Sequence, residues 1–120
     1  MSTRTQYAAD LAALKASLAK MGQLSADAVE DALESLCTAD AEGAKEIIKG
    51  DSEVNRMERD IEHRCMTLLL RQQPVASDLR FISAAMKVVT DVERIGDHAV
   101  NIAEWVEFLR TGRYHHENMF

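Results

Sequence analysis

The stretch FISAAMKVVTDVERIGDHAVNIAEWVEFL, residues 81–109, decides the fold of this chain. Its apolar residues alternate four and three positions apart, which is the period of one face of an α-helix. That face consists of Phe81, Ala85, Val88, Val92, Ile95, Ala99, Ile102, Val106 and Leu109. The pattern predicts an amphipathic helix over residues 77–110, which Ser77 would cap at its start and Gly112 would follow at its end.

Two further segments show the same helical period. Residues 5–37 carry an apolar stripe from Tyr7 to Leu36, and residues 41–72 carry a second one. Asp40 lies where it can cap the second segment, and Pro74, the only proline, follows the end of that segment. We therefore expect three long helices, followed by a short tail over residues 111–120.

Short connections between these helices would make consecutive helices antiparallel neighbours. The sequence thus predicts an all-α fold, in which residues 1–120 form a single up-down-up bundle of three helices. Three helices alone bury a thin core. A second copy packed alongside would remove more apolar surface from water, so we also expect a homodimer.

The composition argues against several classes of function. The 20 acidic and 14 basic residues give a net charge of −6, which disfavours general nucleic-acid binding. No apolar run approaches the roughly 20 residues that span a bilayer, and no signal-peptide core follows Met1, so we expect a cytoplasmic protein. Cys37 and Cys65 fall in apolar helical patterns and are interpreted as small core residues. No phosphate-binding loop or catalytic triad pattern supports enzymatic activity.

Two carboxylates interrupt the apolar pattern of the third predicted helix. Glu93 and Asp97 are four residues apart and project from one helical face. Glu93 falls in a second apolar row beside the core seam, so its carboxylate should be partly desolvated and should need a cation nearby. Either an arginine or a metal ion could supply that charge. Gly96, between the two acids, lets another group approach the backbone.

The second predicted helix carries a matching polar row, which consists of Asp51, Asn55, Glu58 and Glu62. These residues step by four, three and four positions and therefore share a face. Because the second and third helices run antiparallel, the row could converge on Glu93 and Asp97. Carboxylates without histidine at ligand spacing favour iron, magnesium or manganese over structural zinc. The alternative is an acidic face that is solvated or weakly paired.

Three motifs closely resemble the PhoU family in spacing and order: GDSEVNRME (residues 50–58), RQQPVASDLR (residues 71–80) and ERIGD (residues 93–97). The resemblance spans nearly the whole chain and implies a single repeat of a family built from two tandem three-helix bundles. It implies a negative regulator of phosphate uptake and of the phosphate-starvation response. The implied partners are the ATPase of the phosphate ABC transporter and a membrane sensor histidine kinase, so the membrane would be reached only through partners.

The resemblance also implies multinuclear iron or zinc clusters at the family's Glu/Asp-x-x-x-Asp signatures. Together with the two acidic rows it predicts metal ligands at Glu93, Asp97, Asp51, Glu58 and Glu62. We interpret a second group of polar residues as partner-docking: Asp91, Asn55 and Arg94.

Two alternatives to the regulatory role stay open. One is a helical metal-binding protein for metal homeostasis or storage. The other is a small di-iron oxidase, which would need two carboxylate-x-x-His pairs, whereas the sequence offers only Asp60 with His63.

Overall fold

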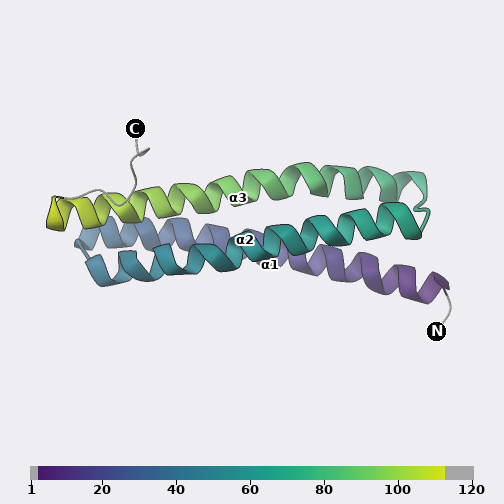
Figure 1. The fold of residues 1–120 in the computed structure, drawn as a ribbon, viewed down its shortest axis with the longest axis horizontal. Helices are drawn as coiled ribbons and strands as arrows, with labels where there is room; N and C mark the ends of the chain where they lie inside the picture. Colours follow the sequence, from purple (N-terminus) through teal and green to yellow (C-terminus); the bar gives the residue numbers. More distant parts are fainter. Residues whose placement is uncertain (1–2, 113–120) are drawn as a thin grey trace.

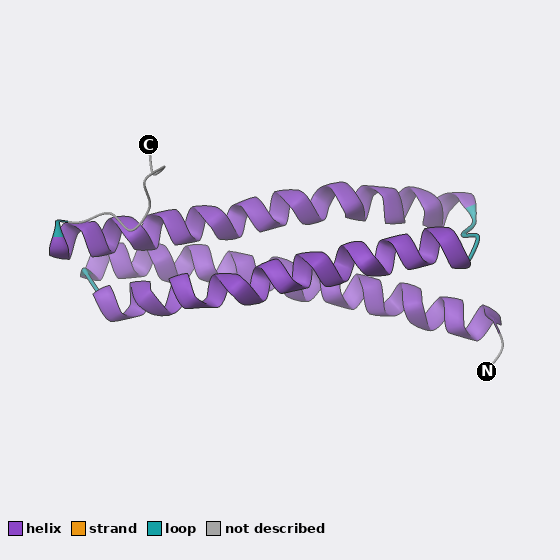
Figure 2. Cartoon of the chain, viewed as in Figure 1, coloured by secondary structure: helices purple, strands orange, loops and turns teal. Residues whose placement is uncertain are grey.

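Three long helices make up the protein in this computed structural model, which describes residues 3–112 (Figure 1). α1 spans Thr3–Thr38, α2 spans Ala41–Arg71 and α3 spans Ala76–Thr111. Within the described residues all regular secondary structure is helical (Figure 2). The chain reverses after α1 and again after α2, so the predicted all-α, up-down-up bundle is confirmed. Residues 113–120 of the expected tail lie outside the described residues.

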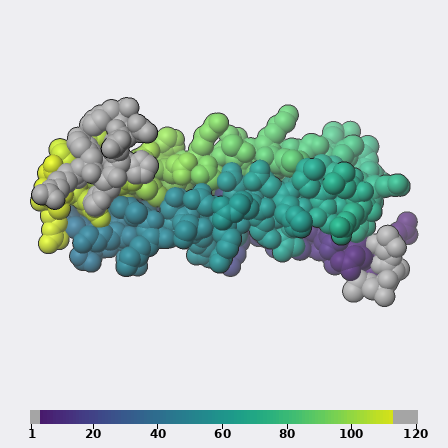
Figure 3. All heavy atoms as spheres, viewed as in Figure 1, coloured from purple at the N-terminus to yellow at the C-terminus, as the bar shows by residue number. Residues whose placement is uncertain are grey.

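The bundle is a thin rod. Its principal extents are 58 × 24 × 19 Å, and each helix contacts the other two. Figure 3 shows α2 and α3 side by side along one face of this rod. Because such a rod has a large surface for its volume, only a narrow seam of side chains is shielded from water.

The helix ends follow the sequence signals with one exception. The Asp40 carboxylate accepts a hydrogen bond of 3.0 Å from the backbone N–H of Gly43, so the predicted cap of α2 is confirmed. Gly112 ends α3 with a φ of 73°. The prediction that Ser77 caps α3 is wrong. Val75 has the extended backbone of a cap residue, which places Ser77 inside the first turn, where its side chain cannot cap.

The main core is built from buried aliphatic side chains of all three helices. Its members are Leu14, Met21, Val54, Ile61, Cys65, Leu68, Ile82, Ala85 and Val89. A second, smaller cluster lies toward the α1–α2 turn and consists of Ala44, Ala103 and Val106. Because alanine fills little volume, the bundle is thinly packed at that end.

Only part of the apolar row of α3 that was predicted to face the core is buried. Val88, Ile95 and Leu109 were expected in the seam, yet they are 43%, 44% and 65% exposed. The neighbouring row is buried instead, through Ile82, Val89, Gly96 and Ala103. Both rows are apolar, so periodicity alone does not choose between them. The small residues of the second row allow the other helices to approach α3 closely, and packing therefore favours that row.

The two cysteines differ in their surroundings. Cys65 is buried in the main core, as predicted, and burial raises the pKa of its thiol. Cys37 is exposed near the end of α1, so its interpretation as a core residue is wrong. It lies in the last turn of that helix, where the bundle has little core to cover it.

A polar contact joins α1 to α3 at the opposite end of the rod. The Tyr7 hydroxyl donates a hydrogen bond of 2.6 Å to the Asp78 carboxylate, 71 residues away in the sequence. Burial, followed by the hydrogen bond and the negative charge of Asp78, raises the pKa of Tyr7 to about 12. The pair fixes the register of the two helices near their N-terminal ends.

Candidate functional site

Four carboxylates from α2 and α3 come together on one side of the rod. Asp51 and Glu58 lie on α2, Glu93 and Asp97 lie on α3, and all four are half-buried. Desolvation, followed by neighbouring negative charges that include Asp97, raises the pKa of both α2 carboxylates, and the charges of those two in turn act on Glu93. The two acidic rows therefore lie within electrostatic range of each other. We refer to Asp51, Glu58, Glu93 and Asp97 as the acidic cluster.

Glu93 has the most perturbed ionisation in the acidic cluster. Its pKa is raised to about 7, first by desolvation and then by a side-chain hydrogen bond with Asp97. The negative charges of Asp97, Glu58 and Asp51 add to the effect. Protonated Glu93 can donate to Asp97, whereas the ionised form would be one more negative charge in a crowded site. The cluster therefore favours any cation that can replace this proton.

The two α2 members show the same pattern more weakly. Desolvation is the largest cause of the raised pKa of Asp51, and the Asp97 charge is the next. The Asn55 amide donates a 3.3 Å hydrogen bond to Asp51 and partly offsets both effects. Desolvation also raises the pKa of Glu58, followed by the charges of Glu62 and Asp97, while Arg59 opposes them.

The remaining predicted site residues are placed differently. Glu62 is half-buried and lies near Glu58, so it extends the acidic cluster by one helical turn. Asp91 and Arg94 are exposed and form a 3.7 Å ion pair on α3. Asn55, which was grouped with them as a docking residue, instead hydrogen-bonds to the acidic cluster. The predicted docking group is therefore divided between two surroundings.

The donor chemistry of the acidic cluster fits a hard or borderline metal ion. None of its four carboxylates forms a salt bridge within residues 3–112. As the side chains stand, however, no three His, Cys, Asp or Glu groups of the described chain are arranged to hold a metal. Mutual repulsion keeps uncompensated carboxylates apart, and a cation would remove that repulsion. Metal binding here would therefore require side-chain rotation that draws the oxygens together.

We expect the stability of the metal-free protein to fall as the pH rises from about 4.5 to about 7. In the folded protein the Glu93 side chain keeps its proton up to about pH 7. In the unfolded chain the same side chain has its ordinary pKa of 4.5. In this window the folded state binds more protons, so the free energy of unfolding decreases with rising pH. Across this window the free energy of unfolding of Glu93→Gln should fall by about 1 kcal/mol less than that of the parent protein, after allowance for solvent screening.

Urea unfolding with a chelator at about pH 5 and about pH 8 measures this difference. Glu30→Gln, an exposed change on α1, is the control and should behave as the parent protein does. Identical pH dependence in Glu93→Gln and the parent would contradict the assignment.

Sequence reasoning did not single out two buried carboxylates of α3. Glu104 and Glu107 are both buried near the C-terminal end of that helix. They flank Val106, which belongs to the apolar stripe, and this position beside a core residue was the available signal. The signal was weak because Glu at such positions usually reaches solvent with its long side chain.

The helices of residues 3–112 include none that is long and apolar enough to cross a membrane.

Comparisons with known proteins agree with this fold. The PhoU domain family matches residues 18–106. The "Phosphate-specific transport system accessory protein PhoU homolog" of Clostridium acetobutylicum is 40% identical over 116 residues, which are 96% of this chain and 52% of that protein. Its counterpart in Pseudomonas aeruginosa is 42% identical over 98 residues, 82% of this chain and 40% of the relative.

Two solved structures give the same result. The crystal structure of PhoU from Pseudomonas aeruginosa matches with a TM-score of 0.82 and 38% identity, over 89% of this chain and 52% of that one. The phosphate transport system regulatory protein PhoU from Streptococcus pneumoniae matches with a TM-score of 0.80 and 35% identity, over 92% of this chain and 53% of that one. The chain thus spans about half the length of these relatives. The match of residues 18–106, together with the shared three-helix fold, shows that this chain belongs to the PhoU family.

Proposed function

We propose that this protein is an accessory protein of phosphate transport, which acts as a negative regulator of uptake and of phosphate-starvation signalling. The observation that carries the proposal is the match of 96% of the chain to a phosphate-specific transport system accessory protein. The long rod with charged faces suits an adaptor, which works by binding. We propose no enzymatic activity, since the sequence contains no recognisable catalytic pattern.

The partners in this proposal are the ATPase of the phosphate ABC transporter and a sensor histidine kinase. Contact with the ATPase would place the chain on the cytoplasmic side, and the membrane would be reached through these partners. The exposed ion pair of Asp91 and Arg94 offers both signs of charge on α3, and Asn55 lies beside the acidic cluster. Such groups at the rim of an interface contribute orientation and specificity.

We also propose that the acidic cluster, with Glu62, holds iron or zinc. Support comes from the half-buried carboxylates, which form no salt bridge in the described chain, and from the strongly raised pKa of Glu93. A bound cation would neutralise this site and tie α2 to α3. These residues would thereby hold the two helices in one register, and the docking faces would become more rigid.

A homodimer is the assembly that we propose, through the exposed apolar row of α3. The row steps by seven residues, through exposed Val88 and Ile95, half-buried Ile102 and exposed Leu109. Exposed Leu33 and Leu36 of α1 add apolar surface. Burial of such side chains against a second copy is favourable at about 25 cal/mol per Å². We expect light scattering to detect dimers, and a mass of one chain at every concentration would contradict this proposal.

Deletion of the gene tests the regulatory function. We expect the deletion strain to express its phosphate-scavenging genes constitutively in phosphate-rich medium, and the intact gene to restore repression. Normal repression in the deletion strain would refute the proposal.

The second candidate function is metal homeostasis or storage, which the acidic cluster also supports. It predicts a different outcome of the same deletion. Cellular iron or zinc content and metal tolerance would change, whereas the phosphate response would stay intact.

A further inference from the structure

A cleft of about 550 Å³ opens between α1 and α2, near the turn that joins them. Its apolar wall includes Leu24, Ala28, Ile47 and Val54. Val54 belongs to the main core, and Ile47 packs against the smaller cluster, so the cleft lies between the two. Its volume is typical of sites for small organic ligands.

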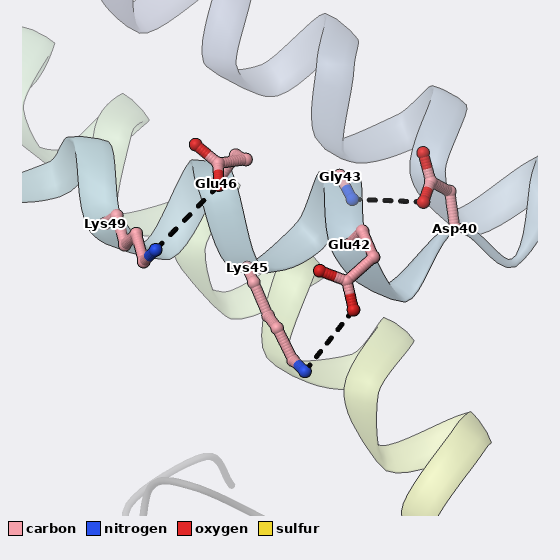
Figure 4. A network of polar contacts seen from close by, with 6 residues as sticks. All are labelled: Asp40, Glu42, Gly43, Lys45, Glu46 and Lys49. Carbon is pink, nitrogen blue, oxygen red and sulfur yellow. Dashed lines mark hydrogen bonds and ion pairs between the residues drawn. The ribbon is translucent and has the colours of Figure 1, made fainter.

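The charged lining of this cleft has a single sign. Seven of its residues are Asp or Glu, and none is Lys, Arg or His. Asp27, Asp31 and Glu34 follow one another along α1, opposite Glu46 and Glu53 on α2. Figure 4 shows that Glu46 lies on the α1 side of α2, whereas Lys45 points away from α1. The 3.9 Å contact of Glu46 with Lys49 is largely exposed and therefore weak.

A buried hydroxyl group gives an independent indication of a ligand. Ser35 lines the cleft and is only 5% exposed, yet its side chain takes part in no hydrogen bond within the described chain. A Cβ atom on Gly43 would lie 2.9 Å from the Ser35 hydroxyl and 2.7 Å from an Asp40 carboxylate oxygen. Both oxygens therefore border the same small space. The Ser35 oxygen is therefore accessible to a donor of a ligand that enters this space.

A second hydroxyl group lies behind the cleft lining and does not itself line the cleft. Ser25 is fully buried, and its oxygen has no hydrogen-bond partner in the described chain. It lies 3.6 Å from where a Cβ atom of Gly96 would stand, and Gly96 lines the cleft.

The distribution of the carboxylates identifies the class of ligand. A single metal ion would need three or more donors that converge on one point. The carboxylates are instead spread along two walls at intervals of about one helical turn, about 5–6 Å, with apolar surface between them. We propose that the α1/α2 cleft binds a linear alkyl polyamine. Its ammonium groups pair with the two acidic walls, its methylene chain covers the apolar wall, and one ammonium donates to Ser35.

Titration calorimetry with spermidine, on the whole chain at constant ionic strength, tests this proposal. The cleft variant is Asp31→Asn/Glu34→Gln, which changes two exposed residues of α1. The control is Glu30→Gln/Asp91→Asn, which removes the same charge from exposed positions outside the cleft. We expect Kd to rise about tenfold in the cleft variant and less than about twofold in the control. Undetectable binding to the parent protein, or equal weakening in the two variants, would overturn the proposal.

Two further measurements distinguish polyamine binding in the cleft from metal binding at the acidic cluster, because the two sites share only Asp51. Glu93→Gln should leave the Kd for spermidine unchanged, because Glu93 does not line the cleft. Mg²⁺ at matched ionic strength should not displace spermidine, since it needs compact oxygen coordination. Displacement by Mg²⁺, or lost binding in Glu93→Gln, would show that the ligand occupies a metal site and would refute the polyamine assignment.

Discussion

The double substitution Glu93→Ala/Asp97→Ala should remove nearly all of the iron or zinc that the native protein retains. The proposed site would be left with Asp51, Glu58 and Glu62, all on α2, and therefore with too few converging oxygens to compete with water. The change also removes the negative charge of Asp97 that acts on Asp51 and Glu58, so the folded protein should be retained. Elemental analysis of natively purified protein measures the metal content per chain.

The control is Asp91→Ala/Arg94→Ala, which removes an exposed ion pair of the same helix and should leave the metal content unchanged. Equal metal content in the parent and the Glu93→Ala/Asp97→Ala variant would refute the ligand assignment. Native protein that carries no metal would refute the proposed metal centre itself.

The substitution Ile61→Ala should destabilise the protein by about 2–5 kcal/mol. Ile61 is completely buried in the main core, which receives side chains from all three helices. Truncation leaves a cavity that straight, closely packed helices cannot readily close. In so thin a rod, one large side chain is a substantial part of the whole core. Urea unfolding, followed by circular dichroism at 222 nm as the usual helical signal, measures the loss of ~2–5 kcal/mol.

Leu70→Ala on the same helix is the matched control. Leu70 is 75% exposed, so its truncation should change stability by less than about 0.5 kcal/mol. A comparable loss in both variants would mean that Leu70 is covered in solution, for example by a second copy. A loss below about 1 kcal/mol in Ile61→Ala would contradict the position of the core.

The acidic cluster shows how far sequence spacing reaches. The four-residue step from Glu93 to Asp97 places both on one face because the helical period is local. Their approach to Asp51 and Glu58 followed from the antiparallel direction of α2 and α3. Spacing could not show that Asn55 hydrogen-bonds to Asp51 while Asp91 stays in solvent. Those details depend on how far each helix is rotated about its own axis.

The apolar rows of α3 show where sequence reasoning fails. Ile95 and Gly96 are adjacent and both fit an apolar row, yet Ile95 is exposed and Gly96 is buried. The rotation of α3 that separates them is set by the fit of side chains from α1 and α2. Gly96 accepts Val54 of α2 closely, and a Cβ atom there would lie 3.4 Å from that side chain.

The sequence by itself determined the three helices, their order and the two acidic rows, because hydrogen bonding and side-chain period within a helix depend on near neighbours in the chain. Only the tertiary structure decided which face of α3 is buried, that Tyr7 bonds to Asp78, and that an acidic cleft opens beside Ser35. Each of these depends on contacts between residues far apart in the sequence. Such contacts follow from how three helical surfaces pack together, which the period of any single helix does not specify.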